Sequence, residues 1–339
     1  MKTRILTLLL CLLTVAGVVA KKQEPEKVVV AYVYSADRIT PDPTKMTHIN
    51  YAFAHVSDTF DGVRIDNEAR LRSVVALKEK NPELKVLLSI GGWGSGNFSE
   101  MAADKKLRKA FAKDCKRVVD EFGLDGIDMD WEYPTQSSSN ISSSPDDTKN
   151  FTKLIKEIRK AIGKKKLLTM ASICTARFVD FKKVAPKLDF INIMAYDMGT
   201  APKLQSALFR SPNSGMCTAS EAVDYHLKAG VSADKLVLGI PFYGRGGKKY
   251  PDWTTYAKIR KDPSVTEEWD DIAKSPYLMK DGEIVFSFDN PRSIAEKCRY
   301  IRDHGLRGAM YWKYAQDNAK GDLRNAVWQG IFGTDNASD

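Results

Sequence analysis

The sequence predicts an α/β protein built as a TIM-type (β/α)8 barrel. Apolar runs rich in β-branched residues alternate with helical patterns along most of the 339 residues, which is typical of a parallel sheet with helical crossovers. Eight such runs occur, and they are nearly continuously apolar, as expected of strands that are covered on both faces. The strand count and the length fit a closed barrel. On this pattern alone, a doubly wound open sheet remains the alternative.

The predicted elements follow one another in the order that such a barrel requires. The expected strands are residues 28–34, 48–55, 85–90, 126–132, 167–173, 190–196, 236–242 and 308–312. The expected helices are residues 67–80, 99–122, 146–162, 179–185, 219–229 and 294–304. For the second helix, Ser99 is the expected N-cap and Gly123 the stop signal. The glycines of residues 91–96 lack the Gly-x-Gly-x-x-Gly spacing of a nucleotide-binding open sheet.

Residues 244–288 interrupt this alternation between the seventh and eighth strands. The segment is rich in Trp, Tyr, Asp and Lys, and we interpret it as a small inserted subdomain or an elaborate loop. The remaining residues from 21 to 339 are expected to form a single domain.

The first twenty residues have the features of a signal peptide. Lys2 and Arg4 form a basic start, residues 5–15 are apolar, and Val18 and Ala20 offer small residues ahead of Lys21. We therefore expect a secreted or periplasmic protein, with an uncleaved membrane anchor as the alternative. No later apolar run is long enough to span a bilayer, so we expect no membrane contact after cleavage.

Charge and composition exclude several kinds of partner. The formal net charge of +9 is spread along the chain, and no basic stripe interleaved with aromatics indicates nucleic-acid binding. No zinc-ligand spacing occurs, so we expect no metal. We also expect no other cofactor, and we expect the protein to be a monomer. The residues considered for this were His48, His55, His226 and His304 with Cys115, Cys174, Cys217 and Cys298. Whether any of these cysteines form disulfides or stay buried thiols is left open.

Three acidic residues occupy alternate positions of the fourth predicted strand. Asp128, Asp130 and Glu132 would share one face of that strand, because alternate side chains point the same way. Carboxylates are costly to bury, so a purely structural strand would carry aliphatic residues there. Pro134 ends the strand and places Glu132 at its carboxyl end, where barrel enzymes carry their chemistry. An exposed edge strand with solvated acids is the structural alternative.

The crowding of these carboxyl groups suggests their roles. They cannot all ionise freely, so at least one keeps a proton near neutral pH. Glu132, the outermost, is the one that can deliver a proton to a leaving group as a general acid. Asp130 would orient a substrate group, and Asp128 would share charge with Asp130.

Residues 125–132 match the signature Asp-x-x-Asp-x-Asp-x-Glu, and the chain here resembles glycoside hydrolase family 18, the chitinase family. Further matching segments are Ser-Ile-Gly-Gly-Trp at 89–93, Met-Ala-Tyr-Asp at 194–197, Gly-Ile-Pro-Phe-Tyr-Gly-Arg at 239–245 and the strand at 308–312. The resemblance runs from about residue 28 to 332. It implies a (β/α)8 barrel, a single catalytic domain and a glycosidase that cuts β-1,4-linked N-acetylglucosamine polymers or oligomers.

The resemblance also implies a substrate-assisted mechanism, which differs from that of most glycosidases. The acetamido oxygen of the substrate attacks the anomeric carbon, and Glu132 serves first as acid and then as base. Asp130 would hold the acetamido N–H, and Asp128 would share a proton with Asp130. By the same resemblance, Tyr32 and Ser89 support Asp128, Tyr196 positions the acetamido oxygen, Asp197 and Met194 line the same subsite, and Trp312 forms its floor.

Other substrate-binding candidates are aromatic or lie in the matched motifs. Trp93, like Trp312, lies at a strand's carboxyl end, where sugars can stack on an indole. Tyr243 and Arg245 are further candidates, and Phe53 is either floor or core. The tryptophan that often follows the family's sixth-strand Tyr-Asp is replaced by residues 198–202, which puts the acceptor subsites in doubt. With no chitin-binding module after the barrel, we expect soluble or accessible oligosaccharides as substrates.

Two other functions compete with this interpretation. An endo-β-N-acetylglucosaminidase acting on N-glycans would use the same chemistry, but the Trp-Glu-Tyr-Pro ending at 131–134 and the inserted segment favour a chitinase. A non-catalytic chitin-binding lectin would be expected to lack the acid, and Glu132 is present.

Overall fold

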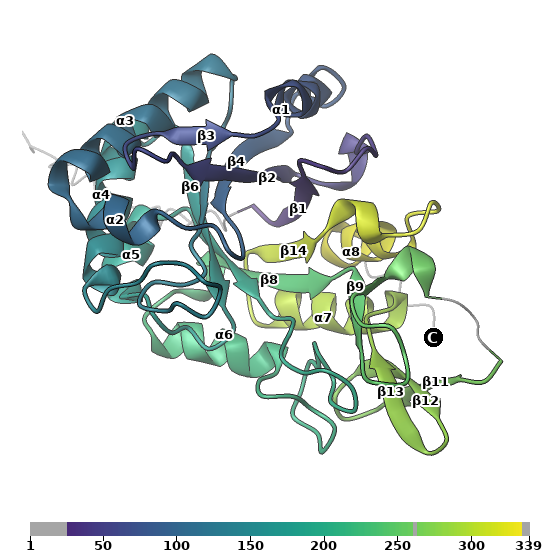
Figure 1. The fold of residues 1–339 in the computed structure, drawn as a ribbon. Coiled ribbons are helices and arrows are strands. Elements are labelled where there is room, and N and C mark those ends of the chain that lie inside the picture. The colour runs from purple at the N-terminus through teal and green to yellow at the C-terminus, as the bar shows by residue number, and fades with distance from the viewer. Residues whose placement is uncertain (1–25, 260–262, 334–339) are drawn as a thin grey trace, which may run out of the picture.

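The computed structural model describes residues 26–259 and 263–333, and its central element is a closed barrel of eight parallel strands (Figure 1). The barrel strands are β1 (Val28–Tyr34), β2 (His48–Val56), β4 (Lys85–Gly91), β5 (Gly126–Asp130), β6 (Leu167–Ile173), β7 (Phe190–Met194), β8 (Leu236–Pro241) and β14 (Gly308–Trp312). Neighbours along the chain are neighbours in the barrel, and β1 closes it by pairing with both β2 and β14. The predicted barrel is confirmed, and the open sheet is excluded.

Helices surround the barrel and cover the outer faces of its strands (Figure 1). They are α1 (Glu68–Val75), α2 (Phe98–Ala103), α3 (Lys105–Glu121), α4 (Asp147–Ile162), α5 (Phe181–Val184), α6 (Ala219–Lys228), α7 (Pro291–Asp303) and α8 (Asp322–Phe332). Short 3-10 turns are η1 (Pro43–Lys45), η2 (Ala76–Glu79), η3 (Ala185–Lys187), η4 (Ala233–Lys235), η5 (Tyr256–Lys258) and η6 (Tyr314–Gln316).

The helix expected over residues 99–122 is two helices. Asp104 is extended, and its carboxylate accepts the backbone N–H groups of Lys106 and Leu107, which caps α3. Ser99 is therefore not an N-cap: it lies inside α2, which begins after Asn97. The predicted stop is correct, because Gly123 follows α3 with a positive φ of 65°.

Two kinds of interior result from the alternation of side chains along the strands. Outward-facing residues pack against the helices in one large apolar cluster that includes Ile127 and Met129 of β5. A smaller cluster fills the barrel itself, and its buried members are Val28, Val30, Tyr32, Ala52, Phe190, Val237 and Met310. Above it the inward positions turn polar, with Ser89, Asp128, Thr169 and Asn192 all buried. This polar layer marks the part of the barrel that is specialised for something other than stability.

The segment between β8 and α7 forms a five-stranded antiparallel sheet in the order β10-β9-β13-β12-β11. Its strands are β9 (Tyr243–Gly246), β10 (Thr254–Thr255), β11 (Thr266–Asp270), β12 (Ser275–Lys280) and β13 (Glu283–Ser287). The sheet projects from one side of the barrel (Figure 1). A further short strand, β3 (Val63–Ile65), pairs antiparallel with β2.

The signal-peptide prediction concerns residues 1–20, which lie outside the described residues. Within the described ranges, the model contains no helix whose length and apolar character would suit a bilayer crossing. The four cysteines left open above, at positions 115, 174, 217 and 298, are buried free thiols.

Candidate active site

The acidic row lies at the carboxyl end of β5. Asp128 and Asp130 belong to the strand, and Glu132 follows two residues after its last residue. The strand is shorter than predicted because its ladder ends with the pairs Gly91–Asp130 and Met129–Met170. The intervening Trp131 is buried in the outer apolar cluster, so the backbone immediately before Glu132 is anchored by packing.

Asp128 is completely buried and accepts hydrogen bonds from four strands of the barrel. The Tyr32 hydroxyl and the Ser89 hydroxyl each lie 2.8 Å from its Oδ2 atom. Thr169 Oγ1 lies 2.5 Å, and Asn192 Nδ2 3.3 Å, from its Oδ1 atom. Burial raises the pKa of Asp128, and these hydrogen bonds oppose that rise. The four donors fix the carboxylate in place.

Asp130 has far fewer partners. The residue is 4% exposed, and its Oδ1 atom is buried without a hydrogen-bond partner among the described residues. Burial raises its pKa well above the usual range, and the charges of Glu132 and Asp128 raise it further. An unpaired buried carboxyl oxygen is costly, so Asp130 is a group that a ligand donor could satisfy.

Glu132 is half-buried at the mouth of the barrel. Burial raises its pKa to about 7, the Tyr133 hydroxyl opposes that rise, and the charge of Asp197 adds to it. A carboxyl group with such a pKa is partly protonated at neutral pH, as a general acid must be.

Tyr196 and its neighbours follow the end of β7. Burial and the charges of Asp130 and Glu132 raise the pKa of Tyr196 well above 10, so its hydroxyl stays protonated and can donate. Its ring packs on the interior cluster with Met194, and its hydroxyl lies 4.0 Å from the sulfur of Met310. Asp197 is exposed beside it, with a positive φ of 57°.

A group of aromatic residues packs on the same interior cluster. Trp312, at the end of β14, stacks on Phe53 with ring centroids 5.5 Å apart and contacts Tyr32 at 5.6 Å. Tyr34 closes the group at 6.4 Å from Trp312. Phe53 is partly buried and packs on the interior cluster; its role as a floor for the sugar stays a prediction.

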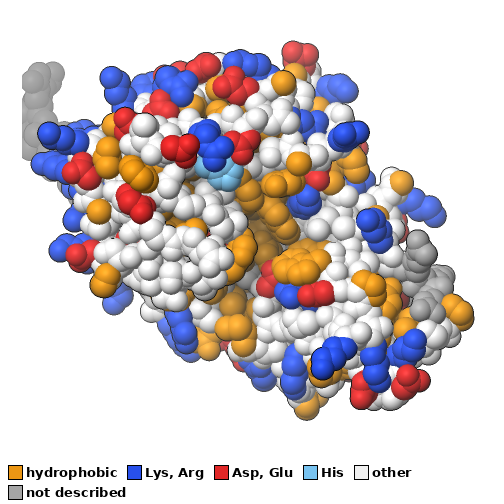
Figure 2. Space-filling model, in the orientation of Figure 1, with side chains coloured by type: hydrophobic (Ala, Val, Ile, Leu, Met, Phe, Trp, Pro, Cys, Tyr) orange, Lys and Arg blue, Asp and Glu red, His pale blue; other side chains and the backbone are white. Residues whose placement is uncertain are grey.

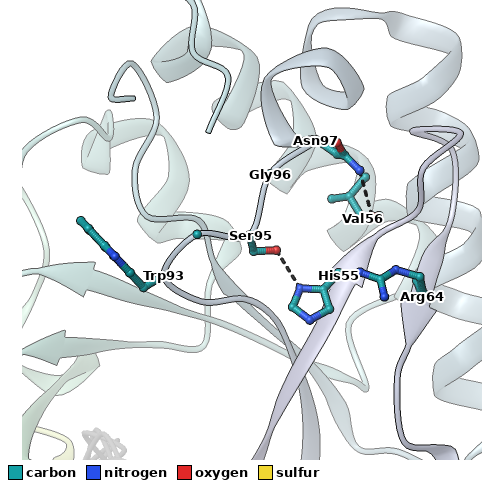
Figure 3. A pocket seen from close by; sticks show the side chains of 8 residues that line it. His55, Val56, Arg64, Trp93, Ser95, Gly96 and Asn97 are labelled. Atoms are coloured by element: carbon teal, nitrogen blue, oxygen red, sulfur yellow. Dashed lines mark hydrogen bonds between the residues drawn. The ribbon is translucent and has the colours of Figure 1, made fainter. Parts of the chain in front are cut away.

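Trp93 is 63% exposed, and its ring centroid lies 6.4 Å from that of Tyr133. It borders a depression of about 220 Å³ formed with His55, Arg64, Ser95 and Asn97. Figure 3 shows His55 and Ser95 facing each other in a 2.8 Å hydrogen bond, with the Trp93 ring directed away from them. The indole is therefore available to solvent, while the polar residues behind it bind one another.

The antiparallel sheet contributes Tyr243 and Arg245 from β9. Tyr243 is buried and its ring lies 6.2 Å from that of Tyr196. Arg245 donates to Asp197 at 2.8 Å and to Asp252 through its Nε atom at 2.8 Å. The inserted sheet therefore supplies part of the wall beside Tyr196.

Sequence reasoning missed several members of this site. Thr169 and Asn192 bind Asp128, and their signal was a polar residue at an inward position of an otherwise apolar strand. Asp252 and Trp253 border Arg245 and had no such signal, because they lie in irregular chain. The space-filling view shows a hollow lined by hydrophobic side chains across the middle of this face (Figure 2).

Comparison with known proteins identifies the family of this site. The sequence model described as glycosyl hydrolases family 18 matches residues 27–317. The chain belongs to this family. The family 18 chain is 31% identical to Chitinase A1 of Niallia circulans, over 82% of its own length and 54% of that protein. It is 31% identical to chitotriosidase-1 of Mus musculus, over 84% of its length and 70% of that protein.

The fold has close counterparts among solved structures. A family 18 N-acetylglucosaminidase from Paenibacillus barengoltzii matches with a TM-score of 0.82 and 32% identity, over 90% of this chain and all of the other. The Group IV chitinase of Ostrinia furnacalis in complex with allosamidin matches with a TM-score of 0.79 and 29% identity, over 89% of this chain and 98% of that one.

Proposed function

We propose that this family 18 enzyme hydrolyses β-1,4-linked N-acetylglucosamine polymers or oligomers with retention of configuration. The observation that carries the proposal is the acidic row, in which Glu132 has a pKa of about 7 and Asp130 keeps a buried oxygen unpaired. An acetamido N–H is the kind of donor that this oxygen lacks. The names of the similar chitinases support the choice of substrate.

In the proposed first step, the acetamido carbonyl oxygen attacks the anomeric carbon while the glycosidic C–O bond breaks. Glu132 gives its proton to the departing oxygen. Asp130 accepts the acetamido N–H and stabilises the positive charge that develops on the acetamido group, and the Tyr196 hydroxyl donates to the acetamido oxygen before attack. Tyr196 suits that role because it stays protonated.

In the second step, the ionised Glu132 takes a proton from water, and the resulting hydroxide oxygen bonds to the anomeric carbon. The cyclic intermediate opens, and the acetamido group is restored. Asp128, which accepts hydrogen bonds from four donors, would share a proton with Asp130 in each step. Trp312 would support the apolar face of the reacting sugar, and Met194 and Asp197 would line the same subsite.

Glu132→Gln tests the mechanism directly. We expect the kcat on chitotetraose to fall by roughly 10²- to 10⁴-fold, while binding of the oligomer is retained. Product release measured by chromatography, with calorimetric binding to the variant, checks both parts. Equal turnover by the two proteins would exclude Glu132 as the acid.

The same assay separates chitinase activity from action on N-glycans. We expect cleavage of chitotetraose and no release of glycan from a high-mannose glycoprotein. We further propose that residues 1–20 direct export and that the enzyme acts as a monomer. Mass spectrometry of the N-terminus of the exported protein and light scattering test these two points.

A further inference from the structure

Trp253 lies in the turn just before β10 of the inserted sheet, and the proposed mechanism does not use its exposed indole. Its residue is 54% exposed, and only Trp93 is a more exposed tryptophan among the residues described. An isolated exposed hydrophobic residue is ordinary. Trp253 differs because its neighbours hold it in place beside Tyr243 and Arg245, the residues next to Tyr196.

Trp253 is fixed by stacking and by its neighbour Asp252. One ring contact is with the buried Tyr243, at 5.1 Å between centroids and 20° between planes. The guanidinium carbon of Arg245 lies 4.1 Å from the centroid of the indole. Asp252 accepts both the backbone N–H of Trp253 at 2.9 Å and that of Gly246 at 3.0 Å.

The same contacts connect Trp253 to the reacting part of the site. Arg245 donates to Asp252 at 2.8 and 3.0 Å, and its third nitrogen donates to Asp197 at 2.8 Å. Tyr243 lies between Trp253 and Tyr196, with ring contacts to each. Trp253 is thus two ring contacts from Tyr196.

The chemistry of the exposed indole fits a sugar face. A β-linked N-acetylglucosamine ring carries its axial C–H groups on both faces, and these apolar faces gain from leaving water against a flat aromatic ring. Because Tyr243 and Arg245 already order the indole, little side-chain entropy would be lost on binding.

We propose that Trp253 is the binding platform for a second N-acetylglucosamine unit, next to the one that reacts. Asp252 and Arg245 are positioning residues that hold the platform. The proposal rests on the proposed function, because it takes the same oligosaccharide as the ligand. It also supplies an aromatic surface to a chain that lacks the tryptophan expected after Asp197.

Trp253→Ala tests the platform, with Trp269→Ala as the matched control. Trp269 lies on β11 of the same sheet and also has an arginine over its ring, Arg292 at 3.8 Å. On chitohexaose we expect Trp253→Ala to raise KM by roughly three- to tenfold with kcat nearly unchanged. The effect should shrink on the shortest oligomer that is cleaved. Trp269→Ala should match the wild type on both substrates.

Asp252→Asn should give a smaller rise in KM, because it weakens the support while keeping the indole. Trp253→Phe, which keeps a ring, should lie between wild type and Trp253→Ala and replaces it if the alanine variant fails to fold. Equal KM values for the wild type and the ring-removing variant on chitohexaose would overturn the proposal. So would a loss that is the same at every oligomer length.

Binding to catalytically impaired protein separates this proposal from the proposed function. Calorimetry with chitohexaose compares Glu132→Gln with the double variant Glu132→Gln/Trp253→Ala. Weaker binding by the double variant supports the platform even if Glu132 proves not to be the acid. If the two bind equally, the platform is wrong whatever the outcome for catalysis.

Discussion

At the scale of single residues, the site contains one carboxylate that accepts many hydrogen bonds and two that accept few. Asp128 accepts four hydrogen bonds, whereas Asp130 leaves an oxygen unpaired. The pKa values of Asp130 and Glu132 are raised by burial, and the charge of Glu132 further raises that of Asp130. Burying these two carboxyl groups costs electrostatic free energy. A ligand that donates a hydrogen bond, or a bound proton, can relieve that cost.

The pH dependence of catalysis follows from Glu132. Its proton is needed in the first step, and its pKa is raised to about 7. We expect kcat/KM on chitotetraose to be highest below neutrality and to fall about tenfold per pH unit on the alkaline side. Initial rates at constant ionic strength check this. An alkaline limb centred near pH 9 would contradict the assignment.

The pH dependence of stability follows from the same group. Folding raises the pKa of Glu132 above its ordinary 4.5, so the folded state binds the proton more tightly and loses stability as the pH rises from about 4.5 to 7. Glu132→Gln cannot ionise. We expect its Tm to exceed that of the wild type at pH 8 and to match it more closely at pH 4. A lower Tm at pH 8 would count against burial as the cause.

At the scale of elements, the buried Lys297 connects α7 to the segment after β7 and pairs with Asp289, which lies just before α7. Lys297 Nζ lies 2.7 Å from Asp289 Oδ2 and 2.7 Å from Ser206 Oγ, and the Lys297 and Asp289 side chains are 0% exposed. Ser206 in turn donates to the carbonyl of Ala195 at 2.6 Å. This chain of contacts supports the backbone immediately before Tyr196.

Lys297→Met should be strongly destabilising, because it leaves the Asp289 carboxylate buried without its charge partner. We expect a loss of about 3–5 kcal/mol in the free energy of unfolding, measured by urea denaturation. The double variant Lys297→Met/Asp289→Asn should recover part of this loss. If the double variant is no more stable than the single one, the cost does not come from the unpaired charge.

Elements with apolar sequence were the predictable ones. Strands such as β1, β6 and β14 were predicted to the residue, because their side chains are buried on both faces. Strand β11 was missed because most of its residues are exposed and carry no apolar pattern. Lys297 gave no signal either, since a lysine in a helix is ordinarily a surface residue.

Within the site, the residues that could be predicted were again those that stand out in the local sequence pattern. The acidic row stood out because three carboxylates occupied positions that a core would fill with aliphatic residues. Trp253 and Asp252 did not stand out, because their importance depends on contacts with Arg245 and Tyr243 made by folding of the inserted sheet. Local pattern cannot give contacts of that kind.

At the scale of the whole molecule, the barrel is closed by β1 and β14, whose first residues are Val28 and Gly308. A Cβ added at Gly308 would lie 1.9 Å from the carbonyl oxygen of Val28. This oxygen belongs to the backbone of a paired strand, so it cannot move aside as the end of a flexible side chain could. The close approach of these two strands therefore requires glycine at this position.

Gly308→Ala should destabilise the closed barrel. We expect a loss of about 1–3 kcal/mol in the free energy of unfolding, as for other overpacked sites. Gly123→Ala provides a comparison, since nothing lies within 4 Å of a Cβ there and only its positive φ of 65° opposes the change. Urea denaturation of both variants checks the order. A smaller loss for Gly308→Ala than for Gly123→Ala would contradict the steric argument.

The pairing of the first strand with the last has a consequence for biosynthesis. While the ribosome is still translating, β1 can find β2 soon after both emerge, but its other edge stays open until residues 308–312 have been made. During that interval the nascent chain presents unpaired backbone and apolar side chains to its surroundings. Chaperone capture should therefore be strongest on stalled chains that end before β14, and should fall once that strand has left the exit tunnel.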